Sequence, residues 1–118
     1  MAAPNIVNVT TITGKTATAN VTTVTANVIT NSAGSSTVLK LNNILLSNYA
    51  ASTQTANVII NRSSINYYIG GNLSVPAQST LVALAKDTSL YLEEGDVLQI
   101  NSSANSSISM TASYEIIS

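Results

Sequence analysis

The sequence predicts an all-β protein, an antiparallel β-sandwich of jelly-roll or immunoglobulin-like type with about eight strands. Three observations support this fold class. The β-branched residues Val, Ile and Thr dominate, whereas helix formers such as Glu, Arg and Met are scarce. Apolar and polar residues alternate over short segments, and polar turns separate these segments at intervals of about 8–12 residues. The chain has 118 residues, so residues 1–118 are expected to form a single domain.

The clearest expected strand lies at the end of the chain. Ile108, Met110, Ala112, Tyr114 and Ile116 alternate there with Ser, Thr and Glu residues. Side chains at every second position of a strand share one face of its sheet. This segment is therefore predicted to form a strand with one buried face and one solvated face.

Shorter patterns predict the other strands. The first comprises residues 6–13, which Gly14 and Lys15 are expected to end as a turn. Gly70 and Gly71 are expected to interrupt the chain between two further short strands. The remaining predicted strands are residues 57–62, 66–69, 73–75, 79–86, 90–92 and 97–101.

Two longer segments change phase part-way along. In residues 16–30 the apolar positions switch from odd to even numbers near Thr22–Thr23. In residues 38–47 they switch from odd to even across Asn42–Asn43. Because side chains alternate strictly across a strand, such a slip is typical of a β-bulge or a bend. Both segments are predicted to curve around a sandwich or barrel.

The charge pattern limits the partners that the chain can recognise. Only 8% of residues are charged, and the net charge is −1. The cations Lys15, Lys40, Arg62 and Lys86 are scattered, so a nucleic-acid partner is not expected. No apolar run approaches the ~20 residues of a membrane helix, so no membrane partner is expected. A neutral surface rich in Asn, Ser and Thr suits a subunit that packs against other proteins.

Candidate catalytic residues are few. The chain has no His and no Cys, which excludes Ser-His-Asp and Cys-His arrangements and thiolate or imidazole metal ligands. The one acidic group consists of Asp87, Glu93, Glu94 and Asp96, around a turn containing Gly95. A solvated β-turn is the favoured interpretation. A Ca²⁺ site and a pair of glycosidase carboxylates remain as alternatives. We expect no enzymatic activity, no cofactor and no metal.

A pair of tyrosines is the most conspicuous aromatic group. Tyr67 and Tyr68 precede Gly70 and Gly71. Exposed Tyr side chains in a loop can form a recognition surface, because they offer a large amphipathic contact area at a small entropic cost. The favoured interpretation is that one ring turns inward and the other lies on the rim, as adjacent strand positions do.

Several segments resemble small virion structural proteins of tailed bacteriophages, particularly those of marine cyanobacterial myophages. The similarity covers nearly the whole chain, although residues 48–69 match only in pattern. The similar segments are MAAPNIVNV at residues 1–9, TITGKT at 11–16, VPAQSTLV at 75–82, LYLEEGD at 90–96 and SYEIIS at 113–118.

The resemblance implies a virion component without an active site. It suits a capsid decoration, neck or tail accessory protein that is located in the virion after assembly in the host cytoplasm. The implied partners are further copies of the chain, with a trimer favoured, and other virion proteins such as the major capsid protein or neck and tail proteins.

The N-terminal segment is a candidate docking element. Residues 1–13 contain the predicted strand with Ile6, Val7, Val9 and Ile12, which carries few charges. Such a strand can add to the edge of a neighbouring sheet. Two other functions stay open. One is an adhesin or receptor-binding module that recognises host surface glycans, and the other is a small carbohydrate-active enzyme.

Overall fold

The computed structural model describes residues 11–85 and 90–118. The described part of the chain forms strands and no helix. In chain order the strands are β1 (Ile12–Val21), β2 (Ala26–Thr30), β3 (Val38–Asn48), β4 (Gln54–Arg62), β5 (Ile65–Val75), β6 (Ser79–Leu84), β7 (Leu90–Leu92), β8 (Val97–Ser102) and β9 (Ile108–Ile117).

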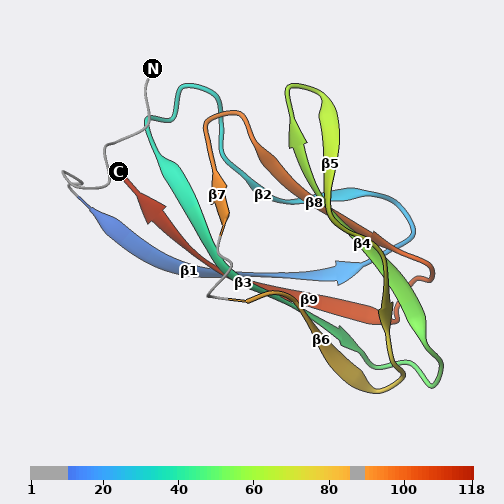
Figure 1. Cartoon of the computed structure of the whole chain (residues 1–118). Helices are drawn as coiled ribbons and strands as arrows, with labels where there is room; N and C mark the ends of the chain where they lie inside the picture. The colour runs from blue at the N-terminus through green and yellow to red at the C-terminus, as the bar shows by residue number, and fades with distance from the viewer. Residues whose placement is uncertain (1–10, 86–89) are drawn as a thin grey trace.

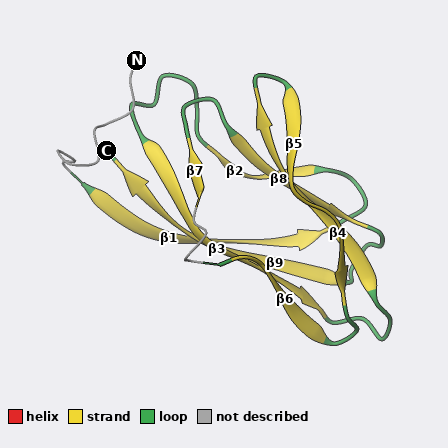
Figure 2. Cartoon of the chain, viewed as in Figure 1, coloured by secondary structure: helices red, strands yellow, loops and turns green. Residues whose placement is uncertain are grey.

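The strands form two antiparallel sheets that pack face to face (Figures 1 and 2). Sheet A has the order β1-β9-β3-β6, and β7 also pairs with β3. Sheet B has the order β2-β8-β4-β5. The predicted all-β sandwich is therefore confirmed.

The pairing is nested along the chain. β1 pairs with β9, β2 with β8, β3 with both β6 and β7, and β4 with β5. The chain thus forms one long hairpin that closes between β4 and β5. Most of its other connections cross from one sheet to the other. This is the strand order of a jelly roll, with β6 and β7 together taking the place of one strand. An immunoglobulin-like sandwich would instead place the first strand beside the second.

The core lies between the inner faces of the two sheets. In β9, Ile108, Met110 and Ala112 are fully buried as predicted, whereas Tyr114 and Ile116 are partly buried. Full burial of each large apolar side chain contributes about 1.5–3 kcal/mol. The buried core cluster comprises Val21, Ile29, Leu39, Leu41, Ile44, Leu46, Ala56, Val58, Val75, Leu84, Leu92, Leu98, Ile100, Ile108, Met110 and Ala112.

The predicted irregularity in residues 38–47 is confirmed, but the predicted single strand over residues 16–30 is wrong, and Val24 and Ala26 of its even-numbered apolar set are exposed. β1 ends at Val21 and β2 begins at Ala26, so the chain leaves sheet A for sheet B around Thr22–Thr23. In β3 the register with β9 shifts between Leu41 and Asn43, which is a β-bulge.

Two predicted strand breaks are wrong. Gly14 and Lys15 lie inside β1, and Gly70 and Gly71 lie inside β5. The first pair is tolerated because β1 is an edge strand, where Lys is common. At Gly70 a Cβ atom would come within 2.5 Å of the Leu73 side chain, so any other residue there would require Leu73 to move. Of the predicted first strand, residues 6–10 lie outside the described residues.

The β4–β5 hairpin offers a simple test of backbone strain. Arg62 pairs with Ile65, and the two turn residues Ser63 and Ser64 have φ values of 54° and 63°. Positive φ at both positions is the geometry of a type I′ turn, which favours Asn and Gly. We expect Ser64→Gly to stabilise the fold by about 0.5–1 kcal/mol in urea denaturation, because Gly has no Cβ to strain.

A matched substitution tests the cause of this gain. Ser74 is an exposed residue of β5 without positive φ. Ser74→Gly should lower stability, because Gly in a strand interior loses more backbone entropy on folding. Equal effects of the two substitutions would contradict the explanation from turn geometry.

Candidate functional site

The acidic turn between β7 and β8 is joined to the end of β4 by an ion pair. The Arg62 guanidinium donates to both oxygens of the Asp96 carboxylate, from Nε to Oδ1 at 2.9 Å and from Nη2 to Oδ2 at 2.5 Å. The Glu93 carboxylate lies 3.0 Å from the same Nη2. The hydrogen bond to Asp96 is the main cause that raises the pKa of Arg62 above its usual value.

Asp96 is buried rather than solvated. Its side chain is only 2% exposed, and its Oδ2 also accepts the Glu93 backbone N–H at 2.8 Å. Glu94 Oε2 accepts the Ser36 backbone N–H at 2.9 Å, which joins the turn to the β2–β3 loop. The expected turn is confirmed, but the expectation that all its acids stay in water is wrong for Asp96. Asp87 lies outside the described residues.

These contacts favour a structural role for the acidic group. Both oxygens of Asp96 already accept bonds from Arg62, so they are not presented to a cation or a substrate. Within residues 11–85 and 90–118 no group of three His, Cys, Asp or Glu side chains is placed to hold a metal ion. The arrangement connects the β7–β8 turn with the end of β4 and with the β2–β3 loop, at one end of the sandwich.

A buried asparagine supports the same end of the molecule. Asn31 follows β2 and is 2% exposed. Its amide nitrogen donates to the backbone carbonyls of Leu92 at 2.9 Å and Thr37 at 3.0 Å. Its Oδ1 accepts the hydroxyls of Ser35 at 2.6 Å and Thr37 at 3.2 Å. The backbone of Asn31 also bonds with Gly95 and Asp96.

A second buried asparagine, Asn48, holds loop backbone at the opposite end of the molecule. Asn48 closes β3, and its amide nitrogen donates to the carbonyls of Ser52 and Val75, both at 2.9 Å. Its Oδ1 accepts the Ala50 N–H at 2.9 Å. Both asparagines stand where a strand meets a polar loop, and the sequence places them only as loop residues. Each asparagine follows an apolar segment in the sequence, and this position is the signal that could have identified it.

The predicted tyrosine pair lies on the edge strand β5. Tyr67 is 54% exposed and Tyr68 is 59% exposed. They pair with Ile60 and Ile59 of β4, so their side chains leave opposite faces of the sheet. The expectation that one ring turns into the core is wrong, because β5 lies at the margin of sheet B. The role of the pair in recognition stays a prediction.

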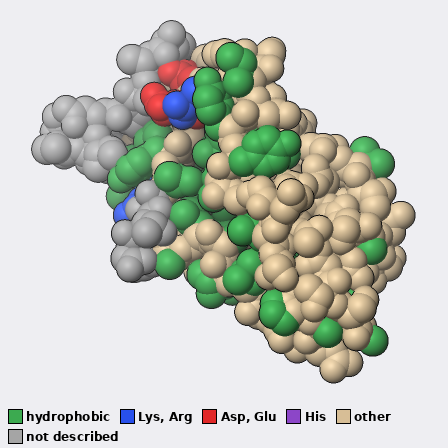
Figure 3. Space-filling model, turned by 45° about the vertical axis from the view of Figure 1, so that its right-hand side comes forward, with side chains coloured by type: hydrophobic (Ala, Val, Ile, Leu, Met, Phe, Trp, Pro, Cys, Tyr) green, Lys and Arg blue, Asp and Glu red, His purple; other side chains and the backbone are tan. Residues whose placement is uncertain are grey.

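The outer face of sheet B carries a row of hydrogen-bonded neutral side chains. Asn101 Nδ2 donates to Thr25 Oγ1 at 2.7 Å, and Asn57 Nδ2 donates to Asn101 Oδ1 at 2.8 Å. Asn57 Oδ1 accepts the Asn72 backbone N–H at 2.7 Å. The row crosses from the start of β2 to β5 and contains no charged side chain. Figure 3 shows a surface that is mostly neutral, with one place where acidic and basic atoms touch.

The predicted docking strand is described only in part. Ile12 begins β1 and is 55% exposed, whereas Ile6, Val7 and Val9 lie outside the described residues. β1 pairs with β9 along one side, and no other described strand lies along its other side. The structure therefore places Ile12 at a free edge of sheet A.

The fold and these surfaces define a neutral jelly-roll sandwich whose polar clusters connect its own loops. No protein-family model matches the chain, and no curated protein shows significant sequence similarity to it. Across the described residues, no helix is long and apolar enough to cross a membrane. The functional conclusion therefore depends on the chain's own edges, faces and charges.

Proposed function

We propose that the chain is a non-enzymatic structural protein of a tailed-bacteriophage virion, which self-associates and docks on the capsid, neck or tail as a decoration or accessory subunit. The observation that carries the proposal is the outer edge of β1, along which no other described strand lies, on a long exposed strand whose only charged residue is Lys15. Long neutral edges promote strand addition in solution, so a free monomer usually covers or interrupts them.

The fold and the charge distribution support an assembling subunit. Jelly rolls occur in viral capsid proteins and in lectins, which is a fold-level analogy and carries no site residues. The carboxylates of the acidic turn bind the protein's own guanidinium and backbone groups. Many weak neutral contacts suit repeated docking on a symmetric particle, because multivalency multiplies modest affinities.

The proposal predicts that the chain is present in purified particles of the phage that encodes it. Quantitative mass spectrometry of gradient-purified virions should detect the chain at a fixed ratio to the major capsid protein. A copy number comparable with that protein would indicate capsid decoration, and the copy number of one ring would indicate the neck or tail. Absence from washed particles, with the chain present in the infected-cell lysate, would contradict the proposal.

One observation favours a second function. The exposed ring of Tyr68 lies on the same face of sheet B as the neutral amide row, since Tyr68 pairs with Ile59, two positions from Asn57 on β4. Aromatic rings beside amide groups can bind sugars by stacking and hydrogen bonds, as in an adhesin for host surface glycans. Binding to a glycan array that is lost in Tyr68→Ala would support this function, and it is compatible with a location in the virion.

A further inference from the structure

The hydrogen-bond pattern of β1 identifies which backbone groups face its free edge. Thr11 and Ser118 exchange both of their N–H···O bonds, at 3.0 and 2.9 Å. In an antiparallel ladder such pairs alternate with pairs whose N–H and C=O groups point away. The β1–β9 register runs without a shift from Ile12 to Val21. The groups that point to the free edge therefore belong to Ile12, Gly14, Thr16, Thr18 and Asn20.

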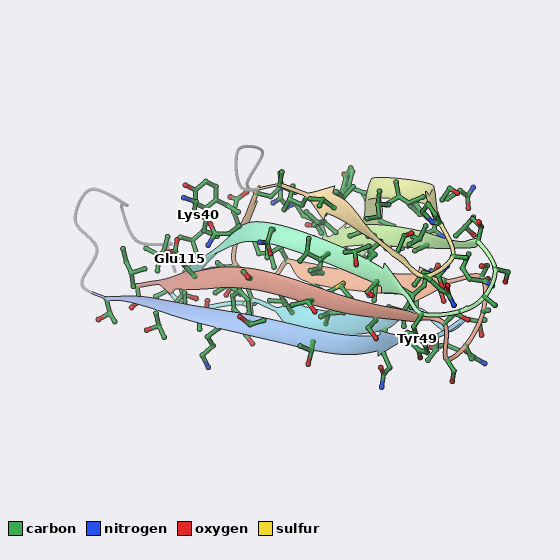
Figure 4. The ribbon with its side chains drawn as sticks, turned by 90° about the horizontal axis from the view of Figure 1, so that it is seen from below. Lys40, Tyr49 and Glu115 are labelled. Atoms are coloured by element: carbon green, nitrogen blue, oxygen red, sulfur yellow. The ribbon has the colours of Figure 1, made fainter. Side chains whose placement is uncertain are left out.

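This edge differs from the other edges of the described sheets. β2 has only five residues. β5 contains two register shifts, and Asn72 within it has positive φ. On the far side of sheet A, the edge is divided between β6 and β7. β1 is thus the one long regular edge among the described strands (Figure 4).

We infer that the β1 edge pairs with the β1 edge of a second copy, antiparallel and about a two-fold axis at Thr16. In this register Ile12 faces Asn20 of the other copy, Gly14 faces Thr18, and Thr16 faces itself. Each of the five facing positions exchanges two backbone hydrogen bonds, so ten would form. The two β-sandwiches would then share one continuous sheet.

The second copy is the favoured occupant because the edge is complementary to itself. A ring of copies would need β1 to pair with a different edge, and the other described edges are short, bulged or divided. A two-fold contact uses the same surface twice. The geometry therefore favours a dimer over the trimer that the sequence and its resemblance suggested.

The side chains on this edge are compatible with the pairing and set its salt dependence. The outer face would bring together small or neutral residues, with Gly14 opposite Thr18 and no charge on either side. On the inner face Lys15 would stand opposite Ala17, so the two lysines of the dimer are diagonal neighbours rather than directly opposed. Their repulsion is screened by salt, so association should tighten as ionic strength rises.

Single-cysteine variants test the register, because the chain has no native Cys. Under mild oxidation Thr16→Cys should form a disulfide-linked dimer, since the two Cα atoms would lie within the range that a disulfide spans. Ile12→Cys and Asn20→Cys should not cross-link alone, but a mixture of the two should. A chain that is monomeric at high concentration, or Asn20→Cys that cross-links alone while Thr16→Cys does not, overturns the inference.

A proline pair tests the edge without cross-linking. The Thr16 N–H points to the free edge, so Thr16→Pro should preserve the fold and weaken dimerisation at least about tenfold in sedimentation equilibrium. The Ala17 N–H points at β9, so Ala17→Pro should lower the melting temperature of the domain itself. A Thr16→Pro protein that is folded and dimerises as tightly as the wild type contradicts edge pairing.

This inference deepens the proposed function by naming the contact through which the subunit associates with itself. The two can fail separately. Loss of dimerisation in solution with the chain still present in purified virions would remove the edge contact and leave the structural role. A dimer with the predicted cross-links that is absent from virions would do the reverse.

Discussion

Replacing Asn31 by Asp should destabilise the protein by about 3–5 kcal/mol at neutral pH. The Asn31 amide nitrogen donates to the carbonyls of Thr37 and Leu92, and a carboxylate has no proton to donate. The substitution would therefore place a negative charge against two carbonyl oxygens at a site that is 2% exposed. Urea denaturation of the purified protein, followed by far-ultraviolet circular dichroism, measures the change.

A control with the same change of charge is available on the surface. Asn20 is exposed on β1, so Asn20→Asp should alter stability by no more than about 0.5 kcal/mol. The loss in Asn31→Asp should also shrink at low pH, because a protonated carboxyl can again donate one hydrogen bond. A loss that is equal in the two variants, or that does not depend on pH, would mean that the Asn31 amide does not hold these loops together.

The fold was accessible from the sequence because its main signals are local. Alternation with period two identified β9 and the acidic turn marked the start of β8, both without knowledge of partners. The phase change in residues 38–47 located the bulge in β3, since a buried face cannot change parity in a regular strand. The apparent phase change near Thr22–Thr23 did not report a buried face, because Val24 is exposed and Ile29 is the buried residue of β2. The breaks predicted at Gly14 and Gly70 failed because the residue type was read without its place in the sheet. Gly14 lies in an edge strand with open space around it, and Gly70 leaves room for the side chain of Leu73.

The polar clusters were not accessible because they depend on contacts between distant parts of the chain. Arg62 meets Asp96 only after β4 and β8 pair in sheet B. Asn48 reaches the carbonyl of Val75 only because β3 and β5 end side by side in different sheets. A sequence shows the polar residues of a loop, but the pairing of strands decides which of them become buried. The free edge of β1 is likewise a property of the sheet order.

The bulge in β3 explains how one strand can bury odd-numbered residues first and even-numbered residues later. Leu41 pairs with Tyr114 and Asn43 pairs with Ser113, so Asn42 is the extra residue. The Ser113 N–H, which faces β3, is accepted by the side-chain Oδ1 of Asn43 at 3.2 Å. The Oδ1 atom of Asn42 is buried and has no hydrogen-bond partner. The extra residue thus disturbs the ladder without changing which face the core residues occupy.

Deleting Asn42 should therefore change stability far less than deleting Leu45 three positions later. Without Asn42, the strand alternates regularly, with Leu41 and Ile44 still facing the core, and we expect a loss of no more than about 2 kcal/mol. Without Leu45, either Leu46 or the pair Leu41 and Ile44 must turn to solvent.

Turning one such side chain outward costs about 2–5 kcal/mol, and the Leu45 deletion also displaces Asn48 from its three hydrogen bonds. The total reaches the whole stability of a typical domain, about 5–15 kcal/mol, so this variant should lack a cooperative unfolding transition. Urea titration and the dispersion of amide proton signals distinguish the two outcomes. If the Asn42 deletion unfolds the domain as the Leu45 deletion does, the bulge itself is required for the fold, through the curvature that it gives β3 or the gap that it leaves between β6 and β7.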